Sequence, residues 1–341
     1  MAYISFQPQD YFNTKLWTGT GAENALTSVG FEPDLTWIKR REVNSHRLFD
    51  AVRGATKFLE SDSTAAEVTD AQELKSFDSD GFTLGTATKV NASGGTYASW
   101  NWKANGAGSS NTDGDITATV SASTTSGFSI VKYTGNGSSG ATVGHGLGSD
   151  VKMVMCKGLG DTYGWKVWHT NLTSGKTLVL QTTAAEDTDA NRIASANAST
   201  FTTSGTFSVN ESGSDYVAYC FAEKKGFSKF GSYTGNGSAD GTFIFTGFKP
   251  AFIMIKRTDT TGDWLMKDNK RPTVQNPVTS LLYPNTSGAE ATGVNDADFL
   301  SNGYKIRTTG TAENASGGTY IYMAFAESPI VSSNGVPATA R

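Results

Sequence analysis

Residues 91–97 read NASGGTY, and the same seven letters return at residues 314–320. A second element, YTGNG, occurs at 133–137 and again at 233–237, and the related WTGTG stands at 17–21. The two YTGNG copies begin 100 residues apart. Self-similarity at a fixed spacing is the mark of a repeated structural unit. The chain therefore reads as three similar units.

Further markers occur in the same order in each unit. A segment that ends in lysine reads LTWIK at 35–39, MVMCK at 153–157 and FIMIK at 252–256. An aromatic segment closes each unit and begins near Tyr97, Tyr216 and Tyr320. We expect these divisions: residues 1–105 (an N-terminal segment and repeat 1), 106–119 (a Gly/Ser/Asn linker), 120–225 (repeat 2), 226–328 (repeat 3) and 329–341 (a C-terminal tail).

The composition predicts an all-β fold. The 341 residues include 38 glycines but only 18% charged residues, which is far from the composition of a helical bundle. The 7 tryptophans, 12 tyrosines and 19 phenylalanines supply too much apolar surface for a disordered chain. Short β-rich runs bounded by Gly, Asp, Asn and Pro suit a sandwich. We therefore predict three homologous β-sandwich-like repeats in tandem.

The closing segment of each unit has one large face and one mostly small face, because alternate side chains of a strand point in opposite directions. Trp102, Phe221 and Phe325 lie on the large face, which we expect to be the buried core between the two sheets of each unit. Cys220 lies on the small face, and we expect Cys156 and Cys220 to be reduced, buried and inert.

The charge balance points to no particular partner. The formal net charge is −4, and no polybasic run predicts nucleic-acid binding. No apolar run approaches the length of a membrane span, so we expect no membrane insertion. The opening MAYISFQPQDYF lacks the pattern of a signal peptide, and two cysteines make no disulfide framework. We expect synthesis in a reducing cytoplasm.

Few residues are candidates for catalysis or for binding a ligand or metal. Lysine recurs at 39, 157 and 256, and we expect a strand-end lysine that discourages edge pairing rather than a ligand-binding residue. None of the three histidines has a partner at metal-ligand spacing: His46, His145 and His169. We expect His145 in a turn and His169 at the surface. No nucleophile elbow or phosphate loop is complete.

Sugar binding is an alternative function, because exposed aromatic rings on a β scaffold can stack on sugars. The recurring rings are Trp17, Tyr133, Tyr233, Trp165 and Trp264. We favour core or turn packing for them. The sequence thus predicts no enzyme and no catalytic, cofactor-binding or metal-binding residues.

The markers resemble a domain repeated in virion proteins of tailed bacteriophages, mostly of marine phages and associated with tail fibres. The shared pattern is the YTGNG turn, the strand ending in Lys39, Lys157 or Lys256, and the aromatic closing strand. Repeat 2 departs most, because it lacks the proline that stands at 33 and 250. The resemblance covers nearly the whole chain and supplies no catalytic residues.

That resemblance implies a structural virion protein made in the host bacterial cytoplasm. We expect a tail fibre or tail appendage that takes part in assembly and in host-surface attachment. Alternatives are a capsid-decorating or collar/baseplate protein without host contact, and, in another class, a tail-attached carbohydrate-active enzyme. Expected partners are other virion proteins, further copies of the chain with a trimer favoured, and a host-surface glycan or protein. Modules arranged in series and an apolar tail at 329–341 favour such assembly.

Overall fold

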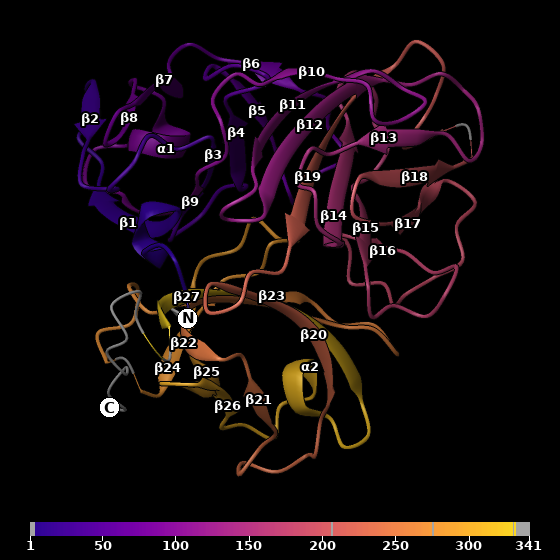
Figure 1. Ribbon diagram of the computed structural model, residues 1–341. Coiled ribbons are helices and arrows are strands. Elements are labelled where there is room, and N and C mark those ends of the chain that lie inside the picture. Colours follow the sequence, from indigo (N-terminus) through magenta and orange to yellow (C-terminus); the bar gives the residue numbers. More distant parts are fainter. Residues whose placement is uncertain (1–3, 206, 275, 330, 332–341) are drawn as a thin grey trace.

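The computed structural model describes residues 4–205, 207–274, 276–329 and 331, which form mostly antiparallel β-strands. The described helices are single turns: η1 (Pro8–Asp10), α1 (Thr88–Asn91) and α2 (Thr311–Asn314). The all-β fold predicted from the composition is confirmed. Figure 1 shows the strands gathered in three lobes that follow one another along the chain, from indigo through magenta to yellow.

The first lobe, unit 1, spans residues 12–102. Its strands are β1 (Phe12–Thr18), β2 (Asn24–Leu26), β3 (Leu35–Arg40), β4 (Arg47–Asp50), β5 (Lys57–Leu59), β6 (Val68–Thr69), β7 (Leu74–Asp78), β8 (Gly81–Leu84) and β9 (Thr96–Trp102). The large sheet has the order β1-β9-β3-β4-β5-β6, and the small sheet has the order β2-β8-β7.

The second lobe, unit 2, spans residues 109–222. Its strands are β10 (Ser109–Asn111), β11 (Ala118–Ser123), β12 (Phe128–Thr134), β13 (Thr142–Gly144), β14 (Val151–Gly158), β15 (Lys166–His169), β16 (Leu178–Val179), β17 (Arg192–Ala196), β18 (Thr200–Ser204) and β19 (Asp215–Ala222). The large sheet has the order β10-β11-β12-β19-β14-β15-β16, and the small sheet has the order β13-β18-β17.

The third lobe, unit 3, spans residues 228–329. Its strands are β20 (Ser228–Thr234), β21 (Phe243–Phe245), β22 (Phe248–Arg257), β23 (Trp264–Asp268), β24 (Val278–Leu281), β25 (Ala291–Leu300), β26 (Gly303–Ile306) and β27 (Thr319–Pro329). The large sheet has the order β20-β27-β22-β23, and the small sheet has the order β21-β26-β25-β24.

The three large sheets share one strand order. It reads β1-β9-β3-β4 in unit 1, β12-β19-β14-β15 in unit 2 and β20-β27-β22-β23 in unit 3. The register matches as well, since the pairs β1–β9, β12–β19 and β20–β27 place Trp17 opposite Tyr97, Tyr133 opposite Tyr216, and Tyr233 opposite Tyr320. These rings stack with centroids 5.2, 5.2 and 4.8 Å apart. The shared order supports the prediction of three tandem repeats.

Hydrogen bonds between the repeated sequence markers connect the first turn of each unit to the segment that leads into its closing strand. In unit 3 the Asn314 amide donates to the Ser238 and Thr308 carbonyls at 2.7 Å, and its Oδ1 accepts the Asn236 backbone N–H at 3.0 Å. In the other units Asn91 and Asn210 make the bonds that match those to Asn236 N–H and to Ser238 O. The turn passes so close that a Cβ on Gly235 would lie 2.3 Å from a backbone oxygen. The recurring letters thus make the same contacts in each unit.

The large faces of the closing strands lie in one core shared by all three units. Trp102, Phe221 and Phe325 are buried as predicted, each 1% exposed. Their ring centroids form a triangle with sides of 5.7, 6.0 and 6.4 Å. Our expectation that this face fills the space between the two sheets of one unit was wrong. The small face does so instead: Ala218 and Cys220 pack with residues of the small sheet.

The units close into a ring rather than standing in series. The backbone N–H of Glu67 in unit 1 donates to Leu159 O in unit 2, at 2.7 Å. Glu186 of unit 2 does the same to Thr258 of unit 3, at 3.0 Å, and Glu290 of unit 3 to Arg41 of unit 1, at 2.7 Å. The third bond returns to the first unit, so the argument from modules in series does not apply to this chain.

The predicted linker includes a strand, whereas most of the predicted tail lies outside the described residues. In the segment 106–119, β10 pairs with β11 and extends the large sheet of unit 2. At its start, the buried Asp34 carboxylate accepts the backbone N–H groups of Ala104 and Gly106, at 2.5 and 2.9 Å. Of the tail 329–341, only Pro329 and Val331 lie within the described residues, and Pro329 pairs with Phe248.

Candidate functional site

The three recurring lysines are buried. Each lies one residue before the end of its strand, as expected, but our prediction that they guard a sheet edge was wrong. Lys39, Lys157 and Lys256 are each 0% exposed. Each strand that carries one lies inside its large sheet, between two neighbours. Burial lowers the pKa of Lys39 and of Lys256 to about 8. The lysines are therefore interior residues and are unavailable to a ligand.

Backbone carbonyls surround these ammonium groups and satisfy their donors. Lys39 Nζ donates to Asn44 O at 2.7 Å and to Ser287 O of unit 3 at 3.5 Å. Lys256 Nζ donates to Arg257 O at 2.8 Å and to Thr183 O of unit 2 at 3.3 Å. Two of the three lysines thus help to join neighbouring units. Alternation along the strand placed them on a face but gave no sign that another unit covers it.

The histidines are structural as well. His46 Nδ1 accepts the Trp37 indole N–H at 2.9 Å, so Nε2 carries the proton toward Tyr283 O of unit 3, at 3.1 Å. His145 follows β13 and is buried, with Nδ1 accepting the Leu147 N–H at 3.2 Å. His169 was expected at the surface, which was wrong, because it is 1% exposed. Burial lowers its pKa to about 3.

Both cysteines are free and buried, as predicted. Burial raises the pKa of the Cys156 thiol to about 12 and also raises that of Cys220. A thiol is a much weaker nucleophile than a thiolate. Their chemical inertness stays a prediction.

The recurring aromatic residues do not form a sugar-stacking surface. Trp165 and Trp264 are at most 1% exposed, and their indole N–H groups donate to Glu60 O and Val179 O of the preceding unit, at 2.8 and 3.2 Å. Trp17 and Tyr133 are buried against their stacked partners. Packing was therefore the correct interpretation. The described aromatic side chains that reach the solvent most are different ones: Tyr163, Phe207, Phe243 and Phe245.

A polar groove at the junction of units 1 and 2 is the best candidate for a binding surface. A hollow of about 540 Å³ is lined by Lys57 and Glu67 of unit 1 and by Lys132, Asp161 and Asp215 of unit 2, among others. A neighbouring hollow of about 200 Å³ shares Lys132 and Asp215 with it. The two hollows therefore adjoin each other at the Lys132–Asp215 pair, and together we call them the groove.

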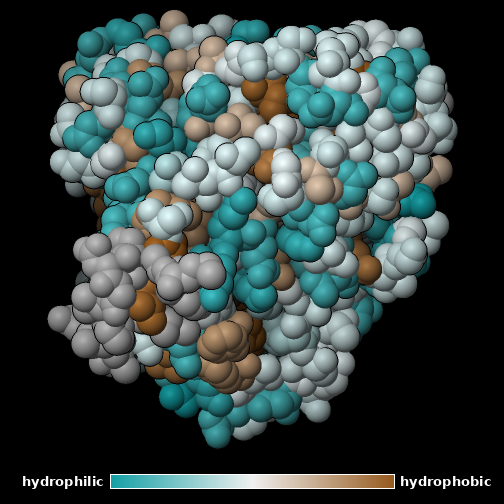
Figure 2. Space-filling view, in the orientation of Figure 1, coloured by the Kyte–Doolittle hydropathy of each residue, from teal (hydrophilic) through white to brown (hydrophobic). Residues whose placement is uncertain are grey.

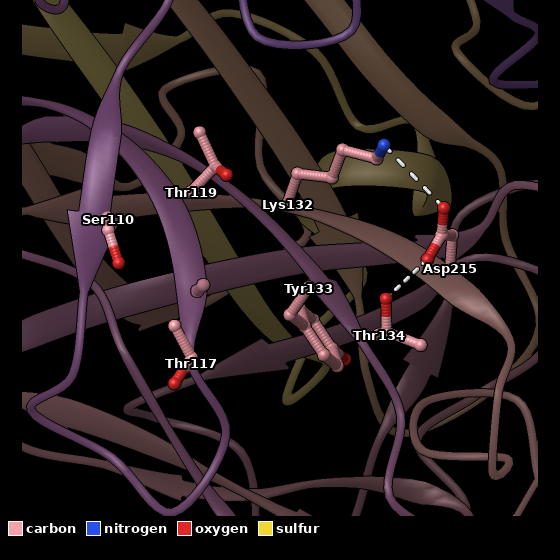
Figure 3. A pocket seen from close by; sticks show the side chains of 8 residues that line it. Ser110, Thr117, Thr119, Lys132, Tyr133, Thr134 and Asp215 are labelled. Atoms are coloured by element: carbon pink, nitrogen blue, oxygen red, sulfur yellow. Dashed lines mark hydrogen bonds and ion pairs between the residues drawn. The ribbon is translucent and has the colours of Figure 1, made fainter.

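Figure 3 shows how the hydroxyl groups and charges of the second hollow lie. Residues of β10, β11 and β12 line it, and the Asp215 carboxylate at the start of β19 accepts the Thr134 hydroxyl at 2.6 Å. Lys132 Nζ lies 3.5 Å from the same carboxylate. Lys57 is paired with Glu67 at 3.2 Å. Paired charges and hydroxyl groups suit a neutral, polyhydroxylated ligand better than a strongly charged one.

The other two junctions differ from this one. Between units 2 and 3 a hollow of about 330 Å³ is lined by Glu186, Thr258 and Thr319, among others. Between units 3 and 1 an ion pair joins Arg41 and Glu290, at 2.6 Å. Sequence reasoning missed all three places, because each is built from two units and lies between repeats rather than within one.

The surface is otherwise mostly polar in the view of Figure 2, with scattered brown spots. One tan to brown spot lies in the lower lobe, where Figure 1 places β21. Phe243 and Phe245 on this strand are 43% and 58% exposed. Single exposed apolar residues are common, and two neighbouring aromatic rings make a small apolar patch.

Two further observations concern the described residues only. They hold no group of three or more His, Cys, Asp or Glu side chains placed to bind a metal ion. None of their helices is long and apolar enough to cross a membrane.

The fold and junctions define an all-β protein of three interlocked lobes. Residues 7–329 match the model of a domain of unknown function, DUF7483, and the chain belongs to this family. The single match runs through all three units, as their shared core would suggest. Comparison with curated proteins and with solved structures gave no match.

Proposed function

We propose that this protein is a structural component of a tailed-bacteriophage virion and serves in a tail fibre or tail appendage. The observation that supports a structural role is the closed ring of units around one core, with the 2.7 Å bond from Glu290 to Arg41 completing it. A unit in such a ring cannot loosen without exposing the core of the other two. The repeated markers resemble phage virion domains, and this resemblance is our reason for assigning the protein to a phage particle.

The proposed partners are other virion proteins, further copies of this chain, and a host-surface molecule. The groove at the junction of units 1 and 2 is the surface we assign to host contact, with a neutral glycan as its ligand. Its hydroxyl groups and paired charges match sugar hydroxyls, and Tyr163 lies two residues after Asp161 of its lining. We assign no catalytic role to its carboxylates.

A second candidate is a decorating or collar protein. Three similar lobes around one axis would fit a position on a threefold symmetry axis of the particle, where one chain could contact three identical partner subunits. The shared strand order of the three large sheets favours this candidate.

Localisation on intact particles tests the proposal. Mass spectrometry of purified virions should detect the chain, and gold-labelled antibodies against it should mark the tail. Labelling on the head or at the collar would favour the second candidate, and absence from purified particles would reject both. A glycan-release assay on host envelopes tests the enzyme alternative, and we expect no release.

A further inference from the structure

The three junctions between units are built on one backbone pattern. In each unit, the residue that follows the lysine-bearing strand donates its backbone N–H to the carbonyl at the start of the closing strand, at 2.8 to 2.9 Å. The carbonyl of that same residue accepts the backbone N–H of a glutamate from the unit before it in the ring. We call it the junction residue, and the junction residues with their glutamates are Arg41 with Glu290, Leu159 with Glu67, and Thr258 with Glu186.

The side chain of the junction residue differs from one junction to the next. Between units 3 and 1, the Arg41 guanidinium donates to both carboxylate oxygens of Glu290, at 2.6 and 3.1 Å. Leu159 and Thr258 carry no charge and cannot form such a pair. Instead they line the hollows of about 540 and 330 Å³. One junction is therefore filled by an arginine, and the other two are hollow.

The hollow between units 2 and 3 lies at the same place in the repeat as the groove between units 1 and 2. Strand pairing gives the matching positions in the two linings. In the order unit 2, then unit 3, they are Lys132 and Ser232, Tyr133 and Tyr233, Thr134 and Thr234, and Asp215 and Thr319. The two linings thus come from equivalent parts of the fold.

Hydroxyl groups dominate the lining between units 2 and 3. The Thr258 and Thr319 hydroxyl oxygens lie 2.8 Å apart, and the Glu186 carboxylate accepts the Thr173 backbone N–H at 3.0 Å. Among the described residues that line this hollow, Glu186 is the one charged side chain. Hydroxyl groups both donate and accept hydrogen bonds, as sugar hydroxyls do, and the carboxylate disfavours an anionic ligand.

We propose that the hollow between units 2 and 3 is a second groove for a neutral glycan, and that Arg41 closes the third equivalent place. This inference rests on the glycan role proposed above for the groove between units 1 and 2. One chain then holds two glycans, one at each open junction. Two sites on one chain raise the avidity for a surface that repeats its sugar units.

Transfer of the arginine to the open junctions tests the role of the junction residue. Thr258→Arg should place a guanidinium beside Glu186, as in the filled junction, and should abolish binding in the second groove alone. Leu159→Arg should act in the same way beside Glu67 and abolish binding in the first groove alone.

Two further variants keep the test independent of folding. Ser232 is an exposed residue of the second lining, so Ser232→Trp should block that groove without disturbing the buried Thr258. Thr260→Arg is the matched control, because it adds the same charge at an exposed position outside the lining. Melting temperatures of all variants show which of them keep the fold.

Native mass spectrometry of the full chain counts the bound ligands. The probe is a panel of short neutral oligosaccharides from bacterial surface polysaccharides, and the best binder is used at saturation. Wild type and Thr260→Arg should bind two copies. Thr258→Arg, Ser232→Trp and Leu159→Arg should each bind one copy, and the double variant of Leu159→Arg and Thr258→Arg should bind none.

The outcomes separate this inference from the proposed function. One copy per wild-type chain, lost in Leu159→Arg but kept in Thr258→Arg and Ser232→Trp, would overturn the second groove and leave the first. No binding of any oligosaccharide in the panel would reject the glycan role of both grooves. Three copies on wild type would contradict the closure of the third place by Arg41.

Discussion

At the residue scale, Asn314 shows how one side chain can hold a repeated motif together. Its amide bonds three backbone groups from two different segments. Asn314→Ala should lower the free energy of unfolding by about 2–3 kcal/mol, since buried backbone groups would lose their partners. Denaturant unfolding followed by tryptophan fluorescence measures this loss. Thr309→Ala, at an exposed position nearby, should change stability by less than about 0.5 kcal/mol.

His169 gives a prediction about acid stability. Its pKa is about 3 in the fold and should return to about 6.5 on unfolding, so the unfolded chain binds the extra proton as the pH falls below 6.5. Stability that His169 maintains above pH 6.5 is therefore lost on acidification, by about 2–3 kcal/mol at pH 4.5. The stability difference between wild type and His169→Leu should shift by that amount in favour of the variant between pH 6.5 and 4.5. An unchanged difference would contradict the buried neutral state.

At the element scale, the closing strands give the clearest test of the shared core. Phe325→Ala should cost about 3–5 kcal/mol, because the ring touches Trp102 and Phe221 of the other two units and the space cannot easily collapse. Hydrogen exchange should then speed up in β9 and β19 as well as in β27. Faster exchange in unit 3 alone would show that the three units keep separate cores.

The same strands mark the limit of prediction from sequence. Alternation correctly separated Phe221 from Cys220 and assigned both to the interior. It could not tell which neighbour covers each face, because that depends on how units far apart in the sequence close on one another. Lys39 and His169 were misplaced for the same reason, since the parts that cover them come from other units or from distant strands.

The sequence did not predict the candidate groove for the same reason. Lys132 and Asp215 are ordinary surface residues when unit 2 is considered alone, and Lys57 and Glu67 are ordinary loop charges in unit 1. Only the junction brings them together. The buried Lys267–Glu313 ion pair of unit 3, at 2.8 Å, lies outside the shared sequence markers, so the repeat pattern did not predict it.

At the scale of the whole molecule, the shared core predicts a single cooperative transition. Independent modules would melt in separate steps, whereas units that expose one another's core should unfold together. Calorimetry should give one peak with a van't Hoff enthalpy close to the calorimetric enthalpy. Two or three resolved peaks would mean that the junctions contribute little.

Assembly belongs to this scale too. We expect the protein to form a homo-oligomer, with a trimer favoured, when it is part of a fibre. Light scattering at micromolar concentration should then give a multiple of 36.1 kDa. A stable monomer, unchanged by removal of residues 329–341, would favour the decorating role, in which one chain contacts three partner subunits.

The bonds that pass from Glu67 to unit 2, from Glu186 to unit 3 and from Glu290 back to unit 1 are head-to-tail contacts that close after three steps. Three identical polypeptides, each made of one such unit, could close the same ring. Every substitution would then be present at all three contacts, because the three chains would share one sequence. Covalent fusion removes that constraint. One junction can carry an arginine–glutamate pair while another stays hollow, and one unit can hold a buried Lys267–Glu313 ion pair between its sheets.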